Sequence, residues 1–392
     1  MDLIGTGDFI RADWLAELHE HLLEDGSGLL KPKSNNEIHF ILAQQFSAQF
    51  EIEGQAGRVD LLVMVPSYEL ALRLSEIFYK ARCPLEMSDV ALQMRPDELI
   101  QRILDASPEA YIVLTGLWTP ESAAYNSRFG FRSLHDCFGS LTSEIHAVET
   151  GLSSDPGMCW RISDLDDKTM ISASAAESAR SLAREFTLFE SELSYHGIGL
   201  ALRQSAPNRV VGTIEQASEL GAHFFNGHRN CLIAKSPIET HFEGRRCPSC
   251  RKELTIGSFQ RMLELTDRSA EELSVSEERG WIRSEHLNKP SFRRMIPLAM
   301  IIAATYGIKS KESQTVDRVY EEALSTGLNE KTILLDLSEN DLLSLLGQQV
   351  TEGILRVREG YFRISPGYDG VPGQLEIFEA EETAELLQLK LF

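Results

Sequence analysis

The sequence predicts an α/β fold, in which a sheet or barrel of mainly parallel strands is followed by a mostly helical part. Three observations lead to this prediction. Short apolar segments alternate with amphipathic segments in the first half, two close pairs of His and Cys residues interrupt the middle, and the last third is mainly of helical periodicity. With 392 residues the chain is longer than one domain usually needs, so we expect several domains.

The first half contains the alternating elements. Residues 37–42, 59–65, 111–114, 146–149 and 169–172 are short, apolar and rich in β-branched residues, as strands are. Helical periodicity fits residues 12–23, 68–81, 96–106 and 175–185. The start at Pro96 is well defined, because proline fits the first helical position and the acids Asp97 and Glu98 face the positive end of the helix dipole. In such folds the chemistry lies at the carboxyl ends of the strands.

The middle of the chain carries a candidate metal site. His228 and Cys231 form one H-x2-C pair, Cys247 and Cys250 form a C-x2-C pair, and 15 residues separate the pairs. Four soft ligands in two close pairs suit tetrahedral zinc in a closed, structural site. The alternatives are His241 in place of His228 and a metal-free loop with reduced thiols.

Charge is distributed unevenly along the chain. The formal net charge is −21, yet residues 211–310 hold 14 Lys+Arg against 12 Asp+Glu, whereas residues 1–210 hold 17 against 31 and residues 311–392 hold 7 against 16. Because phosphate contacts dominate affinity for DNA, any nucleic-acid contact should centre on the middle third. Four basic residues flank the second Cys pair and either contact phosphate or form a solvated surface: Arg245, Arg246, Arg251 and Lys252.

Several phrases of the sequence occur in one order that is similar to a known family. They are LIGTGDF (3–9), LWTPESAAYNSRFGF (117–131), ETGLSSDPGMCWR (149–161), FESELSYHGI (189–198), CPSCRKELTIG (247–257) and ISPGYDGVPG (364–373). Together they resemble the endonuclease Q family over roughly residues 1–378. The resemblance implies a PHP-type distorted β/α barrel, a zinc ribbon and a helical C-terminal domain. It also implies nicking of DNA on the 5′ side of deaminated bases such as uracil and hypoxanthine.

The resemblance divides the chain into four expected segments. They are a PHP-like barrel over 1–208, a zinc-ribbon-like segment over 209–265, a mostly helical domain over 266–378 and a tail over 379–392. The family's H-x-H pair lies on a first strand upstream of the GTGDF phrase, and with a start at Met1 we expect that strand to be missing. We expect no membrane segment and no signal peptide, and therefore a cytoplasmic protein.

The metal ligands that the resemblance implies for the barrel are mostly replaced. Asp8 is kept, whereas Gln45, Asp60, Gly116, Ala175 and Glu177 stand where the family has Glu, His, His, Asp and His. We expect the metal-dependent chemistry to be lost while the scaffold is kept. The alternative is a rebuilt magnesium or manganese site of Asp8, Asp60 and Glu177, since oxygen ligands suit these ions. The third interpretation is ordinary surface charge.

The tail ends in Gln388, Leu389, Lys390, Leu391 and Phe392, which resembles the short peptide that binds the bacterial sliding clamp. Such a peptide needs a Gln amide and apolar anchors, here Leu389, Leu391 and Phe392. The alternative is a helix end that packs on its own domain. The similar pentapeptide at 374–378 is expected to be a strand.

The sequence thus favours a non-catalytic protein related to endonuclease Q that binds DNA lesions or DNA structures, or regulates a partner. Two alternatives stay open. One is an active endonuclease with the rebuilt carboxylate site, and the other is a protein-interaction scaffold, for another protein subunit, that makes no contact with DNA.

Overall fold

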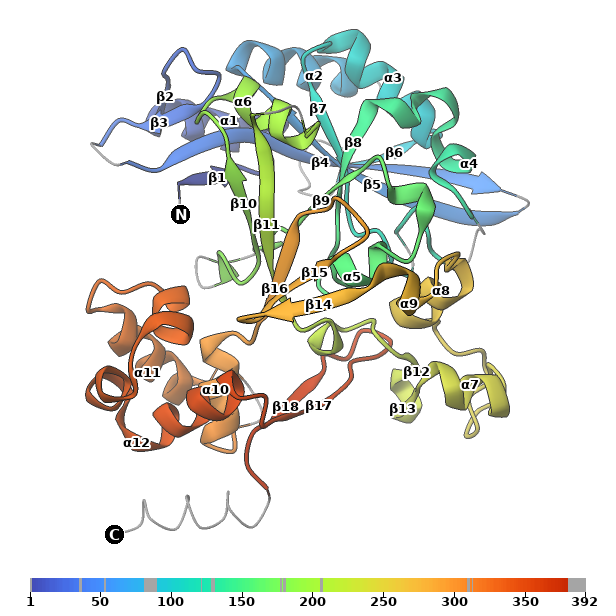
Figure 1. Ribbon diagram of the computed structural model, residues 1–392. Coiled ribbons are helices and arrows are strands. Elements are labelled where there is room, and N and C mark those ends of the chain that lie inside the picture. The colour runs from blue at the N-terminus through green and yellow to red at the C-terminus, as the bar shows by residue number, and fades with distance from the viewer. Residues whose placement is uncertain are drawn as a thin grey trace.

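The computed structural model describes residues 2–379 except 35–36, 53, 81–89, 121, 128–130, 177, 179–180, 205–206, 309–310 and 312. Figure 1 shows a curled sheet with helices along one side, a small projecting module around α7 and a helical domain around α10 to α12. The predicted fold class is confirmed in its main parts, namely a mixed α/β half-barrel followed by a helical C-terminal region. No helix among the described residues is long and apolar enough to cross a membrane.

The half-barrel is a nine-stranded sheet with the order β2-β3-β4-β5-β7-β8-β9, to which β1 and β6 add by pairing with β4. Its strands are β1 (Leu3–Gly5), β2 (Leu22–Glu24), β3 (Leu30–Pro32), β4 (His39–Ile52), β5 (Gln55–Val65), β6 (Val90–Gln93), β7 (Tyr111–Leu114), β8 (Ile145–Glu149) and β9 (Thr169–Ile171). Its helices are α1 (Ala12–His21), α2 (Tyr68–Lys80), α3 (Pro96–Ala106), α4 (Leu134–Phe138), α5 (Pro156–Cys159) and α6 (Tyr195–Leu202).

The sheet is mixed, whereas the sequence predicted mainly parallel strands. β7, β8 and β9 are parallel, but β4 pairs antiparallel with β5 and β5 antiparallel with β7. The reason is local: two residues separate β4 from β5, and Gly54 has a φ of 79°. A connection this short permits only antiparallel pairing.

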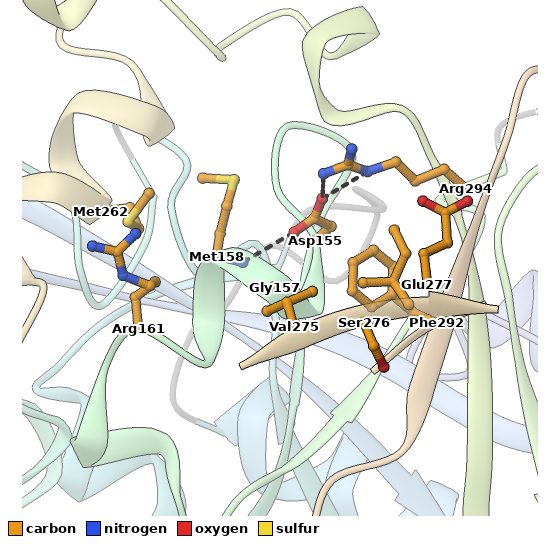
Figure 2. A pocket seen from close by; sticks show the side chains of 11 residues that line it. Asp155, Gly157, Met158, Arg161, Met262, Val275, Ser276, Glu277, Phe292 and Arg294 are labelled. Atoms are coloured by element: carbon orange, nitrogen blue, oxygen red, sulfur yellow. Dashed lines mark hydrogen bonds and ion pairs between the residues drawn. The ribbon is translucent and has the colours of Figure 1, made fainter. Parts of the chain in front are cut away.

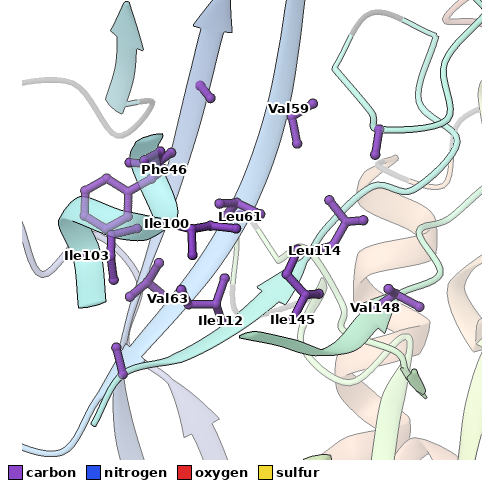
Figure 3. Close-up of a cluster of buried hydrophobic side chains, with 14 of the residues drawn as sticks. Phe46, Val59, Leu61, Val63, Ile100, Ile103, Ile112, Leu114, Ile145 and Val148 are labelled. Atoms are coloured by element: carbon purple, nitrogen blue, oxygen red, sulfur yellow. The ribbon is translucent and has the colours of Figure 1, made fainter. Parts of the chain in front are cut away.

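The core of the half-barrel lies between this sheet and helices α2 to α4. On β5, Val59, Leu61 and Val63 alternate with residues of the opposite face and are fully buried. Figure 3 shows Leu61 and Val63 close to Ile100 and Ile103 of α3, within the same buried cluster as Val59. Burial of each such side chain stabilises the fold by about 1.5–3 kcal/mol relative to exposure.

A second sheet joins the first half of the chain to the later part. It has the order β10-β11-β16-β15-β14, with β10 (Phe186–Glu190), β11 (Arg209–Gln216), β14 (Val275–Glu278), β15 (Trp281–Ser284) and β16 (Ser291–Met295). β14, β15 and β16 lie after residue 266, where the sequence predicted a mostly helical domain. The β14–β15 hairpin turns at Arg279 and Gly280, whose φ angles of 53° and 81° match the tight turn that suits hairpins.

The remaining elements form the ribbon module, by which we mean residues 226–256, the helices α8 and α9 that follow it, and the C-terminal domain. They are β12 (Asn226–His228), β13 (Ile233–Lys235), α7 (Pro237–Glu243), α8 (Ser258–Leu265), α9 (Ala270–Leu273), α10 (Leu298–Thr305), α11 (Gln314–Leu324), a π-helical turn (Thr332–Asp336), α12 (Glu339–Arg358), β17 (Arg363–Ser365) and β18 (Gln374–Glu376). The strand predicted within 374–378 is β18. The helix predicted over 175–185 is wrong for the described residues, because Ala175 and Ala183 have positive φ and Arg184 donates to the carbonyls of Ser174 and Ala175.

Helix α8 anchors the ribbon module to the half-barrel. Arg261 is buried and donates to the carbonyls of Tyr125 at 2.9 Å and Phe131 at 2.8 Å. Its guanidinium also pairs with Glu264 at 3.1 Å. The position of the module on the barrel therefore depends on bonds that water does not compete for.

Candidate functional site

Four residues of the ribbon module converge on one point. The ligand atoms of His228, Cys231, Cys247 and Cys250 all lie within 4.8 Å of one another. Nδ1 of His228 is 3.6 Å from Sγ of Cys250. Two ligands of a tetrahedral zinc ion, with Zn–S near 2.3 Å and Zn–N near 2.05 Å, are separated by about 3.6 Å. The donor set and its spacing therefore fit a metal ion, and His241 lies outside this group, exposed on α7.

The backbone around the second Cys pair favours a thiolate. The pKa of Cys247 is lowered to about 6, chiefly because the backbone N–H of Cys250 donates to its sulfur, with a further contribution from the N–H of Ser249. The amide of Arg251 also donates to the carbonyl of Cys247 at 2.9 Å, which closes the tight turn. Metal ligands must be deprotonated, so this turn prepares one of the four.

The four predicted basic residues differ in their surroundings. Arg245 is held by Glu264, with 2.6 Å between Nη2 and the carboxylate. Arg246, Arg251 and Lys252 are exposed, and none has an ion pair with another described residue. Three positive charges on this module are therefore open to an anionic partner.

The two predicted carboxylates of the barrel that the structure describes do not form a comparable cluster. Asp60 is buried, and its Oδ1 accepts from Nε of Arg58 at 2.8 Å and from Oγ of Ser47 at 2.5 Å. Asp8 is half-buried with a φ of 50°, and burial raises its pKa although the nearby Arg11 opposes the shift. Glu177 lies outside the described residues. Among the described residues neither Asp8 nor Asp60 belongs to a group of three potential ligands.

A further replaced ligand position, Gly116, has a structural role of its own. Gly116 has a φ of 57°, and a Cβ there would lie 3.0 Å from Oγ1 of Thr119. Its amide donates to Oε2 of Glu149 at 2.8 Å. A histidine at 116 would therefore be strained by the backbone and crowded by its neighbour. Gln45 of β4 is exposed.

A buried network of carboxyls and hydroxyls joins the ends of β9, β10 and β11, and the sequence analysis missed it. Oγ of Ser172 lies 3.0 Å from a carboxyl oxygen of both Glu185 and Glu215. A hydroxyl has only one proton to donate, so both contacts are satisfied only when one of the two carboxyls is itself protonated. Burial raises the pKa of Glu185, with the charge of Glu215 adding to it, and burial raises the pKa of Glu215 to about 8. Two single acids 30 residues apart, at 185 and 215, give no sequence signal of this kind.

A groove of about 1390 Å³ lies between these strand ends and the C-terminal domain. Leu152, Arg184 and Gln216 line it from the barrel side. Tyr361 and Arg363 line it from the other side, and Tyr361 is exposed over 68% of its surface. The groove thus combines cations with an exposed aromatic ring beside the end of the barrel where such folds carry their chemistry.

A smaller cavity of about 410 Å³ lies between α5 and the β14–β16 strands. Figure 2 shows Arg294 reaching Asp155 across its wall, at 2.6 Å between Nη2 and Oδ2. The other oxygen of Asp155 caps α5 by accepting from the amide of Met158 at 3.0 Å. The buried carboxylate of Asp155 is therefore already paired with Arg294, and this ion pair stabilises the loop that leads into α5.

Comparisons with known proteins identify the fold. No protein-family model matches the chain. The uncharacterised protein YqxK of Bacillus subtilis (strain 168) is 25% identical over 382 residues, covering 96% of this chain and 89% of that protein. The crystal structure of the lesion-specific endonuclease PfuEndoQ from Pyrococcus furiosus is similar with a TM-score of 0.77 and 23% identity, over 100% of this chain and 91% of that chain.

A second solved structure is endonuclease Q in complex with a 27-mer duplex that carries an abasic lesion at the active site. It is similar with a TM-score of 0.81 and 23% identity, over 99% of this chain and 90% of that chain. The similarity covers the half-barrel, the ribbon module and the C-terminal domain together. The chain therefore has the fold of endonuclease Q.

Proposed function

We propose that this protein binds damaged or distorted duplex DNA without cutting it. The proposal rests on the hydrogen bonds and the ion pair of the Asp60 carboxylate. This residue stands at a metal-ligand position of the family that the sequence resembles, yet Arg58 and Ser47 hold the same carboxylate oxygen.

Hydrolysis of a phosphodiester by metal ions needs ligands that are free to hold the ions and a metal-bound water. A guanidinium 2.8 Å from Oδ1 of Asp60 already neutralises the carboxylate. A divalent cation would have to displace that guanidinium and would meet its charge at close range. Among the described residues, neither Asp60 nor the retained Asp8 belongs to a group of three possible ligands.

The positive surface of the ribbon module supports DNA as the partner. Arg246, Arg251 and Lys252 are exposed without ion pairs among the described residues, in a chain whose total charge is −21. Phosphate contacts supply most of the affinity of proteins for DNA. The similar endonuclease Q chain was solved with duplex DNA, and the same partner is proposed here.

Zinc is the metal that we propose for the ribbon module, held by His228, Cys231, Cys247 and Cys250. Its role there is structural, because all four positions of a tetrahedral ion are taken by the protein. The ion would fix the turn that carries the three open cations.

Fluorescence anisotropy tests the proposal with labelled duplexes that carry one abasic site, uracil or hypoxanthine, beside an undamaged duplex. We expect salt-dependent binding that is tighter to the damaged duplexes. Arg251→Ser should reduce the slope of log K against log salt by about 1, the value of one lost phosphate contact. The matched control Arg73→Ser removes an exposed cation from α2 and should leave the slope unchanged.

Absence of DNA binding at low salt would refute the proposal and would favour a protein-interaction scaffold, which the net charge of −21 also suits. The sliding clamp stays a proposed partner on the sequence alone, because Gln388, Leu389, Leu391 and Phe392 lie outside the described residues. Co-elution with a purified clamp, lost when Leu391 and Phe392 are changed to Ala, would test that partner.

A further inference from the structure

The ribbon module exposes large apolar side chains to solvent. Leu232, Ile238 and Phe242 have 81%, 71% and 80% of their surface exposed. They fall within eleven residues of one another in the sequence, in the small projecting module of Figure 1. Single exposed hydrophobic residues are common, but three such highly exposed ones on one small module indicate an interaction site.

The module holds two of these residues on one fixed face. Ile238 and Phe242 are four residues apart on α7 and therefore lie on the same side of the helix. The opposite side is anchored, because Thr240 is buried and its hydroxyl accepts from the side-chain amide of Asn226 at 2.8 Å. The His241 ring packs edge-on against Phe242 with 5.2 Å between centroids.

Leu232 is presented in a different way. It has a left-handed backbone, with φ of 54° and ψ of 38°, directly after Cys231. This conformation is unfavourable for a residue with a bulky side chain and persists only where the surrounding structure imposes it. Since the ligand atoms of Cys231 and Cys250 lie within 4.8 Å of each other, the metal site holds Leu232 close to the turn that carries Arg251.

Positive charge predominates in the module that carries this apolar face. Residues 226–256 hold 6 Lys+Arg against 3 Asp+Glu, a formal +3 in a chain of −21. Two of the three acids are engaged locally: Glu239 caps α7 through Ser236, and Glu243 pairs with Lys235 at 3.0 Å. Arg246 follows α7 after the turn at Gly244.

We infer that Phe242 and Ile238 form a wedge that inserts between stacked base pairs of duplex DNA while Arg246, Arg251 and Lys252 contact the flanking phosphates. Proteins that kink DNA insert apolar side chains between base steps and bind the backbone on both sides with cations. Three exposed cations on the same module fit a polyanion better than they fit an ordinary protein surface. The inference rests on the proposed function and adds how the duplex is deformed.

The test uses the full-length protein and a duplex with 2-aminopurine at successive positions near an abasic site. We expect 2-aminopurine fluorescence to rise at one step when the protein binds, because insertion unstacks the base. Phe242→Ser should abolish that rise and weaken binding about tenfold, within the range measured for lost aromatic stacking on bases. The matched control is Tyr79→Ser on α2, which removes another aromatic ring exposed over 71% of its surface and should change neither signal.

Each outcome decides between the two proposals. If the protein binds the duplex and Phe242→Ser leaves the fluorescence and the affinity unchanged, the wedge is wrong and the proposed function stands. If the protein binds no DNA, both fall. If Phe242→Ser instead converts a dimer to a monomer in light scattering with DNA binding intact, the face is a protein interface and the wedge is again wrong. Zinc content measured for each variant shows whether the module is still folded.

Discussion

The ribbon module and the strand ends of the half-barrel are both places where the sequence predicts clustered ligands, and they differ in outcome. In the module, His228 and three cysteines converge within 4.8 Å. In the barrel, the carboxylate of Asp60 is paired with the guanidinium of Arg58. The position of Gly116 has no side chain, and its amide donates to the carboxylate of Glu149. Two residues that resemble ligands in the sequence can therefore differ entirely in whether a metal ion could reach them.

The comparison shows that, among the described residues, the ribbon module, and not the barrel, brings four potential metal ligands together. A structural metal site retains its ligands because the fold of its module depends on them. The barrel keeps its shape with buried bonds such as those of Glu215 with Thr150 and Ser172, which require no ion. Under the proposed function, the protein is a DNA-binding scaffold that lacks the hydrolytic site.

The largest expected effect comes from removing the metal of the ribbon module. Structural zinc contributes about 10–16 kcal/mol of binding energy in zinc-finger peptides, so its loss should unfold the module. His228→Ala should lower the zinc content and raise amide hydrogen exchange over residues 226–256, while His241→Ala, an exposed histidine of the same module, should change neither. Loss of zinc in His241→Ala with retention in His228→Ala would reverse the ligand assignment.

The next effect concerns the bonds that join the module to the barrel. Arg261→Ala leaves the buried carbonyls of Tyr125 and Phe131 without a donor and should lower the free energy of unfolding by about 2–4 kcal/mol. Arg245→Ala removes an exposed partner of the same Glu264 and should cost about 0–1 kcal/mol. Urea unfolding measures both. Equal losses would show that Arg261 does not carry the connection.

A smaller, pH-dependent effect is expected from the buried carboxyl pair of the barrel. Burial raises the pKa of Glu215 to about 8, whereas the same group ionises near its ordinary value of 4.5 in the unfolded chain. Its contribution to stability is therefore fully present below about pH 4.5 and is lost as the pH rises toward 8, at up to about 1.4 kcal/mol per pH unit for one proton.

Glu215→Gln mimics the protonated acid and should flatten this decline, so that the variant gains stability over the wild type between pH 5 and 8. Urea unfolding at several pH values measures the slope. Glu190→Gln, an exposed residue of β10 paired with Arg209, is the control and should keep the wild-type slope. An unchanged slope in Glu215→Gln would mean that the shared proton resides on Glu185 instead.

The sequence predicted elements with local signals well. Helix α3 begins at Pro96 as expected, because the proline and the acids after it act within one turn. The region 175–185 was predicted as a helix from its helical periodicity, but Arg184 donates to the carbonyls of Ser174 and Ala175 and closes a loop instead. Tertiary contacts such as these are not encoded in a local pattern.

The candidate site was predictable to a similar degree. The spacing of the Cys pairs identifies the four residues that converge, because paired ligands lie close in sequence. The role of Asp60 was predictable only in part, because Arg58 lies two residues away on the same strand whereas Ser47 lies 13 residues away on the neighbouring strand. The pair Glu185 and Glu215 was missed for the same reason, since only the sheet brings these acids together.

The most direct test of the central claim is a strand-cleavage experiment on the protein as it exists. Labelled duplexes with one uracil, hypoxanthine or abasic site are incubated with magnesium, manganese or zinc and resolved on a denaturing gel, beside an active lesion-specific endonuclease. We predict that both strands stay intact under conditions where anisotropy shows the duplex to be bound. A metal-dependent nick on the 5′ side of the lesion that disappears in Asp8→Ala would contradict the account and would show that the barrel has a working metal site.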